Sequence, residues 1–133
     1  MEITIDNLIF FSNFDSGNLA KVEKCRSNPN NSNVNEFDVW TSPDCANTIY
    51  ENDYSSWFYF GIRGSVSDSI LKINIINMNK QVKLYSQGMA PFVKVIPELP
   101  TWKRISDPVS YKVRTSREMM IISLIAIICN LNV

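Results

Sequence analysis

The sequence predicts an all-β protein, an antiparallel β-sandwich of about seven to nine strands. Apolar residues recur at every second position in short runs along the chain. Stretches rich in Asn, Ser and Pro separate these runs, as turns do in sandwiches. Helical periodicity is weak throughout, and 133 residues is the length of one domain.

The N-terminal segment begins with two short predicted strands. Residues 3–5 alternate apolar and polar side chains and lead into a second apolar run, Leu8–Phe11. The sequence Phe14–Leu19 (FDSGNL) predicts a tight corner, in which Gly17 takes a positive φ. Leu19–Cys25 then fits one short helical turn.

The middle of the chain predicts a surface loop between strands. Arg26–Asn35 is polar and rich in Asn, which is typical of a loop. Glu36–Thr41 follows as a strand with Phe37 and Val39 on one face. Ser56–Arg63 carries aromatic side chains on both faces, which predicts a central strand.

The second half predicts four more strands. Ser69–Met78 places apolar residues on one face at period two, and the others follow as Met89–Ile96, Ser110–Arg114 and Met119–Ile128. The apolar run Met119–Cys129 is too short for a bilayer, which needs about 20 residues. It fits a buried strand or a mis-terminated end of the chain.

Composition excludes several classes of function. The chain has no His, which rules out a Ser/His/Asp triad, an imidazole base and a His-ligated zinc site. Its three cysteines, Cys25, Cys45 and Cys129, are an odd and widely spaced set, which favours free thiols in the cytoplasm. The 13 basic and 13 acidic residues balance, so neither nucleic acid nor a membrane is expected as a partner.

The charges are nevertheless divided along the chain. Residues 1–67 contain nine acids and four bases, and residues 68–133 contain nine bases and four acids. Two solvated faces that attract each other explain this division, and we favour that interpretation. The alternative is a basic surface that meets an acidic partner.

Several residues resemble parts of an active site without forming one. Ser16 has no base to activate it, and the carboxylate of Asp44 does not activate the neighbouring Cys45. The acids Glu51 and Asp53 fit solvated loop positions. No catalytic and no metal-ligating residue is therefore predicted in this chain.

Two further groups are candidates for binding. The amides Asn74, Asn77 and Asn79, which precede Lys80, are expected to satisfy loop backbone groups, and a sugar or peptide site is the alternative. Trp102, Lys103 and Arg104 combine an aromatic ring with two cations and are the candidate site for an acidic partner. The competing interpretation is a tryptophan packed on the end of the sandwich under lysine stems.

Six motifs in fixed order carry a family resemblance. They are FDSGNL (14–19), Trp40 with Pro43-Asp44-Cys45, WFYF (57–60), NIINMNK (74–80), LYSQGMAP (84–91) and WKRI (102–105). Together they resemble the N-terminal domain of the cytosolic carboxypeptidases, in particular the type-five branch, which removes branch-point glutamates from polyglutamylated tubulin. The resemblance covers roughly residues 8–115.

The resemblance implies a non-catalytic role. In that family this region is a β-sandwich of about nine strands that precedes a zinc carboxypeptidase domain. The zinc ligands, a His-x-x-Glu pair and a later His, lie in the following domain, so this chain is expected to hold no cofactor and to have no activity alone. The partners implied are that catalytic domain in cis and tubulin, in the cytoplasm and at microtubules.

The resemblance also divides the chain. Residues 1–117 are expected to form the domain, and residues 118–133 are expected to be an apolar tail that departs from the family pattern. This departure implies a sandwich that is incomplete at its C-terminal edge. The candidates for contact with the catalytic domain are Tyr85, Gly88, Met89 and Pro91. The alternative is that these four residues form a tight corner that closes the sandwich.

Two functions from different classes remain open. The chain is either the accessory domain of a zinc deglutamylase or a free-standing module that binds an acidic partner, such as a tubulin tail, through its basic C-terminal half. The second function predicts salt-sensitive binding that weakens when Lys103 and Arg104 are neutralised.

Overall fold

The structure confirms the all-β prediction. This computed structural model describes the backbone of residues 1–30, 32–64, 69–79, 82–95, 99–106, 109–114 and 119–128. Within these ranges lie ten strands and one short helix. Their bounds are β1 (Glu2–Ile5), β2 (Leu8–Phe11), β3 (Leu19–Lys24), β4 (Val34–Thr41), β5 (Gly61–Gly64), β6 (Ser69–Asn79), α1 (Val82–Ser86), β7 (Phe92–Val95), β8 (Leu99–Arg104), β9 (Ser110–Arg114) and β10 (Met119–Ile128).

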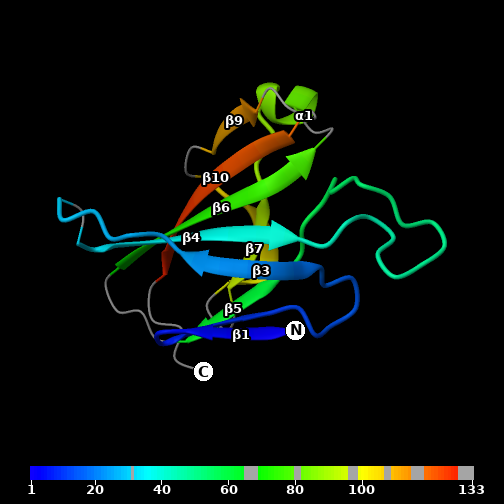
Figure 1. The fold of residues 1–133 in the computed structure, drawn as a ribbon. Coiled ribbons are helices and arrows are strands. Elements are labelled where there is room, and N and C mark those ends of the chain that lie inside the picture. The colour runs from blue at the N-terminus through cyan, green and yellow to red at the C-terminus, as the bar shows by residue number, and fades with distance from the viewer. Residues whose placement is uncertain are drawn as a thin grey trace.

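The strands form three sheets (Figure 1). Their orders are β1-β2-β5, β3-β4-β6-β10-β9 and β7-β8. Neighbours pair antiparallel except β4 and β6, which run parallel with Val34 beside Ile70 and Val39 beside Ile75. The parallel pair arises because the chain leaves β4, contributes β5 to the other sheet and returns as β6, and such a crossover reverses the direction that a hairpin would give.

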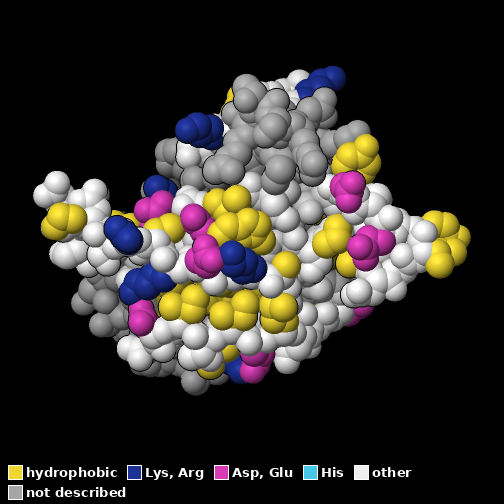
Figure 2. All heavy atoms as spheres, in the orientation of Figure 1, with side chains coloured by type: hydrophobic (Ala, Val, Ile, Leu, Met, Phe, Trp, Pro, Cys, Tyr) yellow, Lys and Arg dark blue, Asp and Glu magenta, His cyan; other side chains and the backbone are white. Residues whose placement is uncertain are grey.

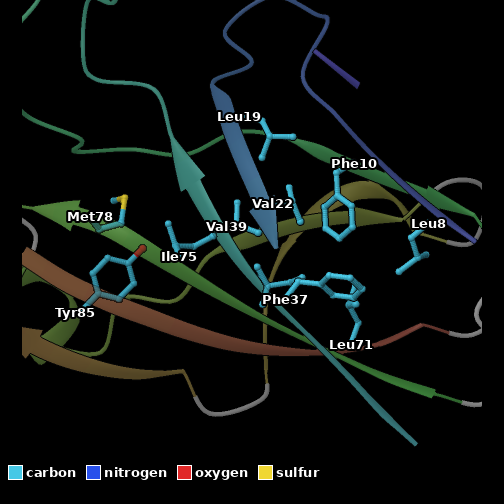
Figure 3. Close-up of a cluster of buried hydrophobic side chains, with 11 residues drawn as sticks. Leu8, Phe10, Leu19, Val22, Phe37, Val39, Leu71, Ile75, Met78 and Tyr85 are labelled. Carbon is cyan, nitrogen blue, oxygen red and sulfur yellow. The ribbon is translucent and has the colours of Figure 1, made fainter. Parts of the chain in front are cut away.

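The core lies between the three-stranded and five-stranded sheets. Phe10 of β2 and Phe37 of β4 are buried, and their ring centroids lie 5.0 Å apart. On β6, Leu71, Ile73 and Ile75 are all buried, which confirms the period-two pattern. Figure 3 shows the Phe10 side chain of one sheet beside Phe37 of the other, so the two sheets pack as a sandwich.

Two predicted elements differ from the structure. The segment expected to form a helical turn is strand β3, and its apolar Leu19 and Val22 are buried. A register shift between Leu19 and Lys21 breaks the period of two, so the apolar spacing imitates a helix. The central strand predicted over Ser56–Arg63 is also wrong, because the strand there is β5, at the edge of its sheet.

Side-chain amides replace strand pairing in the aromatic segment before β5. The Asn18 amide nitrogen donates to the carbonyl of Trp57 at 3.0 Å, and its oxygen accepts from the N–H of Tyr59 at 2.8 Å. Phe58 and Phe60 pack against the core, whereas Trp57 and Tyr59 are exposed. The predicted alternation of faces is therefore correct, although no strand forms there.

The last strand lies inside the larger sheet. β10 pairs with β6 on one side and β9 on the other, and β3 and β9 are the edges of that sheet. Within the segment expected as an apolar tail, 118–133, residues Met119–Ile128 form this strand, which confirms the strand predicted there. Lys80, Cys129 and residues 130–133 lie outside the described residues.

Candidate interaction surfaces

A glycine closes the corner that contains the predicted inter-domain contact. After α1, the N–H of Gly88 donates to the Tyr85 carbonyl at 3.2 Å and that of Met89 to the Leu84 carbonyl at 3.3 Å. This pair of bonds is the Schellman pattern, which places a left-handed residue after the helix. Gly88 has φ of 91°, and nothing lies within 4 Å of where its Cβ would be.

Three of the four predicted contact residues face inward. Tyr85 is 8% exposed and lies beside Met78 in the core (Figure 3), and burial raises the pKa of its hydroxyl. Met89 packs against the core, and Pro91 is buried. These three side chains hold the corner in place, and Gly88 is the member of the set at the surface.

The second predicted cluster is divided between the two faces of β8. Trp102 is 52% exposed and contacts the Tyr59 ring edge-on, with centroids 5.8 Å apart. The guanidinium of Arg104 lies 5.1 Å from the centre of the Phe92 ring, on the neighbouring strand. Side chains alternate along a strand, so Trp102 and Arg104 share one face and Lys103 lies on the other.

The loop between β4 and the aromatic segment is built around one aspartate. The Asp44 N–H donates to the Tyr54 carbonyl at 2.6 Å, and the Asp44 carbonyl accepts from Asn52 at 3.4 Å. The Asp44 carboxylate accepts from the N–H of Ser56 at 3.1 Å. The neighbouring Cys45 is exposed in a left-handed conformation, φ 56°. Asp44 therefore shapes the loop through both its backbone and its side chain.

The tip of this loop was not singled out by the sequence. Ile49 is 91% exposed and Tyr50 is 73% exposed. Figure 1 shows the loop extending away from the sheets, and Figure 2 shows hydrophobic side chains at its far end. The only sequence signal was an apolar pair inside a polar loop, which is too common to identify a site.

Asn77 and Asn79, near the end of β6, satisfy backbone groups as predicted, whereas Asn74 donates to side-chain carboxylates. The Asn77 amide accepts from the Thr41 N–H at 2.9 Å and donates to the Thr41 carbonyl at 2.8 Å. The Asn79 side chain accepts from the Ser55 N–H at 2.7 Å. Both side chains thus connect the end of β6 to the loop that begins after β4.

A polar network joins Cys25, which follows β3, to side chains of β4 and β6. The Asn74 amide donates to Glu36 at 2.8 Å and Asp38 at 2.9 Å, and Lys72 forms an ion pair with Glu36 at 3.0 Å. The Asn74 bond and Lys72 lower the pKa of Glu36. Burial and the hydrogen bond to Asp38 raise the pKa of the Cys25 thiol to about 12, which makes it a poor nucleophile.

The described residues offer no metal centre. No three His, Cys, Asp or Glu side chains gather closely enough to hold an ion in the part of the chain described. The sequence contains no His, so this chain cannot supply the imidazole ligands of a zinc site. The family resemblance implies such a site only for the following domain. Among the described residues, no helix is long and apolar enough to cross a bilayer.

Comparison with known proteins identifies the family. Residues 10–122 match the profile described as the cytosolic carboxypeptidase N-terminal domain. Cytosolic carboxypeptidase-like protein 5 of Rattus norvegicus is 50% identical, over 80% of this chain and 15% of its own length. The Danio rerio protein of the same name is 45% identical, over 88% of this chain and 14% of its own length. Cytosolic carboxypeptidase 1 of Gallus gallus is 33% identical, over 80% of this chain and 8% of its own length.

The matched region, residues 10–122, contains all six motifs named above and most of the strands of the sandwich. The chain spans between 8% and 15% of the length of these relatives and matches the N-terminal domain family. It belongs to the family of cytosolic carboxypeptidase N-terminal domains.

Proposed function

We propose that this chain is the non-catalytic accessory domain of a zinc-dependent cytosolic carboxypeptidase. The observation that carries the proposal is the match of residues 10–122 to the family's N-terminal domain, in relatives of which this chain spans about 15%. The domain packs on the catalytic domain in cis and shapes the approach to its cleft. The parent reaction is the removal of glutamates from polyglutamylated tubulin, and the compartment is the cytoplasm.

The chemistry of the sequence supports an accessory role. A carboxypeptidase of this class needs imidazole ligands for its zinc, and this chain has none. The polar network around Glu36 and Asp38 is occupied by Asn74, Lys72 and Cys25 in structural contacts. The catalytic steps therefore belong to the domain that follows in the relatives.

The test is a domain replacement. Residues 10–122 of this chain replace the matching region of the rat relative, and release of glutamate from a glutamylated tubulin-tail peptide is measured. We expect release by the chimera, none by this chain with added zinc, and less by the rat protein lacking the region. Release by the isolated chain, or undiminished release without any N-terminal domain, would contradict the proposal.

A second candidate function is binding of an acidic peptide by the β7-β8 sheet. Trp102 and Arg104 are exposed on one face, and no ion pair to Lys103 or Arg104 occurs among the described residues. Binding of a glutamate-rich peptide is expected to weaken with salt and with Arg104→Gln more than with Lys103→Gln, because Lys103 lies on the opposite face. If both variants bound the peptide as well as the native chain does, this second candidate function would be contradicted.

A further inference from the structure

We propose that the tip of the loop formed by residues 42–54, here called the docking loop, anchors this domain to the catalytic domain. The tip consists of Ile49 and Tyr50. The inference rests on the proposed function and adds to it the contact surface. The partner's matching feature is an apolar pocket that receives one aliphatic and one aromatic side chain.

The high exposure of both tip side chains supports a partner that covers them. Ile49 is 91% exposed and Tyr50 is 73% exposed, although each has apolar surface whose removal from water is favourable. Single exposed apolar residues are common, but here two adjacent ones lie at the end of a protruding loop (Figures 1 and 2). Tyrosine is also among the residues that contribute most to binding when buried at an interface.

The docking loop is already shaped in the free domain. The Asn47 N–H donates to the Glu51 carboxylate at 2.6 Å, and the Thr48 hydroxyl donates to the Cys45 carbonyl at 2.6 Å. The Thr48 hydroxyl also accepts from the N–H of Tyr50 at 3.2 Å. These bonds hold the tip from both sides, so binding does not have to order the segment first.

The position of the loop places it beside the predicted contact corner. β4 and β6 are parallel, so their C-terminal ends lie at the same end of the sheet. The docking loop follows β4, and the corner with Gly88 follows β6. Asn79, at the end of β6, donates to the carbonyl of Asp53 at 3.3 Å and so connects the two segments. One end of the sandwich therefore presents both features.

A partner in the same chain fits this surface better than a second copy. A stable interface between separate proteins buries about 800 Å² on each side, more than two side chains supply. Covalent linkage raises the effective concentration, so a small contact suffices in cis. The relatives are long enough for such a partner, because this chain spans only about 15% of their length.

The first experiment maps what the tip contacts. Tyr50→p-benzoylphenylalanine is introduced into the chimera described above, with Phe92→p-benzoylphenylalanine as the control, since Phe92 is 51% exposed on β7. We expect crosslinks from position 50 to the catalytic part of the same molecule and none there from position 92. Crosslinks between two molecules would assign the tip to a second copy and overturn the inference, as would no crosslink to the catalytic part.

The second experiment measures coupling between the domains. In the isolated chain, Ile49→Ser with Tyr50→Ser is expected to leave the unfolding midpoint unchanged, because both side chains are exposed. In the chimera the same double substitution is expected to lower the unfolding midpoint of the sandwich to that of the isolated chain. The control substitution, Phe92→Ser, is not expected to do so. Equal midpoints for the chimera and the pair variant would contradict the inference.

The two proposals fail in different ways. A chimera that releases glutamate but gives no crosslink from position 50 overturns the docking inference and leaves the proposed function intact. A folded chimera that crosslinks from position 50 but releases nothing overturns the proposed function alone. A chimera that does not fold counts against both, because the inference requires a compatible catalytic domain.

Discussion

Gly17 sets the path of the chain between β2 and β3. The sequence predicted a corner here with Gly17 at positive φ, but the left-handed residue is Ser16, φ 65°. Gly17 is needed for another reason, because a Cβ there would lie 2.2 Å from the carbonyl oxygen of Ser12. The corner was predictable from composition, whereas the close approach depends on how the corner folds back.

Gly17→Ala is therefore expected to destabilise the domain. The added methyl group meets backbone atoms of Ser12, which must shift, at a cost of about 1–3 kcal/mol. Gly88→Ala is the matched control, since its Cβ would meet nothing and the cost is confined to the left-handed backbone. Urea unfolding of both variants measures the difference. A smaller loss at Gly17 than at Gly88 would contradict this account of the corner.

The two described thiols are expected to differ in reactivity. At pH 8 a Cys25 pKa of about 12 leaves about one thiol in ten thousand ionised, whereas Cys45 is exposed. In a Cys129→Ser background, we expect iodoacetamide to modify Cys45 at least about tenfold faster than Cys25. The folded state favours the neutral Cys25 thiol, so its contribution to stability is present below about pH 8.5 and is lost as pH rises. Equal labelling rates at pH 8 would contradict the protection of Cys25 by partial burial and its hydrogen bond to Asp38.

Among the elements, strands with unbroken alternation were the most predictable. Ser69–Met78 and Glu36–Thr41 lie within β6 and β4, because each alternates over several residues against the core. β3 was missed because its register shift hides the period of two. The aromatic segment before β5 was assigned to a strand because its alternation is real, but it bonds to the side chain and backbone of Asn18 instead of pairing with a strand. Such long-range amide contacts leave no local pattern in the sequence.

Asn77 is expected to be essential for the connection between β4 and β6. Asn77→Ala leaves the N–H and carbonyl of Thr41 without their partner, in a residue that is buried. Each buried group left unpaired costs about 1–3 kcal/mol. Asn30→Ala, at an exposed loop position, is the control, with an expected change within about 0.5 kcal/mol. Similar unfolding free energies for the two variants would show that the amide contacts contribute little.

In the whole molecule, the acidic and basic halves of the sequence are in contact with each other. Of the four ion pairs among the described residues, three lie within residues 1–67, and only that between Lys72 and Glu36 joins the two halves of the sequence. Lys103 and Arg104 were expected to act together, but strand alternation separates them. The exposed loop tip could not be predicted, because exposure is decided by where neighbouring segments pack. The sequence therefore identified the candidate residues better than the surface they form.

An accessory domain of the kind proposed is coupled to its catalytic domain. This coupling is measured by scanning calorimetry of the chimera and of the isolated chain. We expect the sandwich to unfold in the chimera at a higher temperature than alone, because a partner that binds the folded state stabilises it. A sandwich transition at the same temperature in both proteins would mean that the domains are independent and would contradict the proposed coupling.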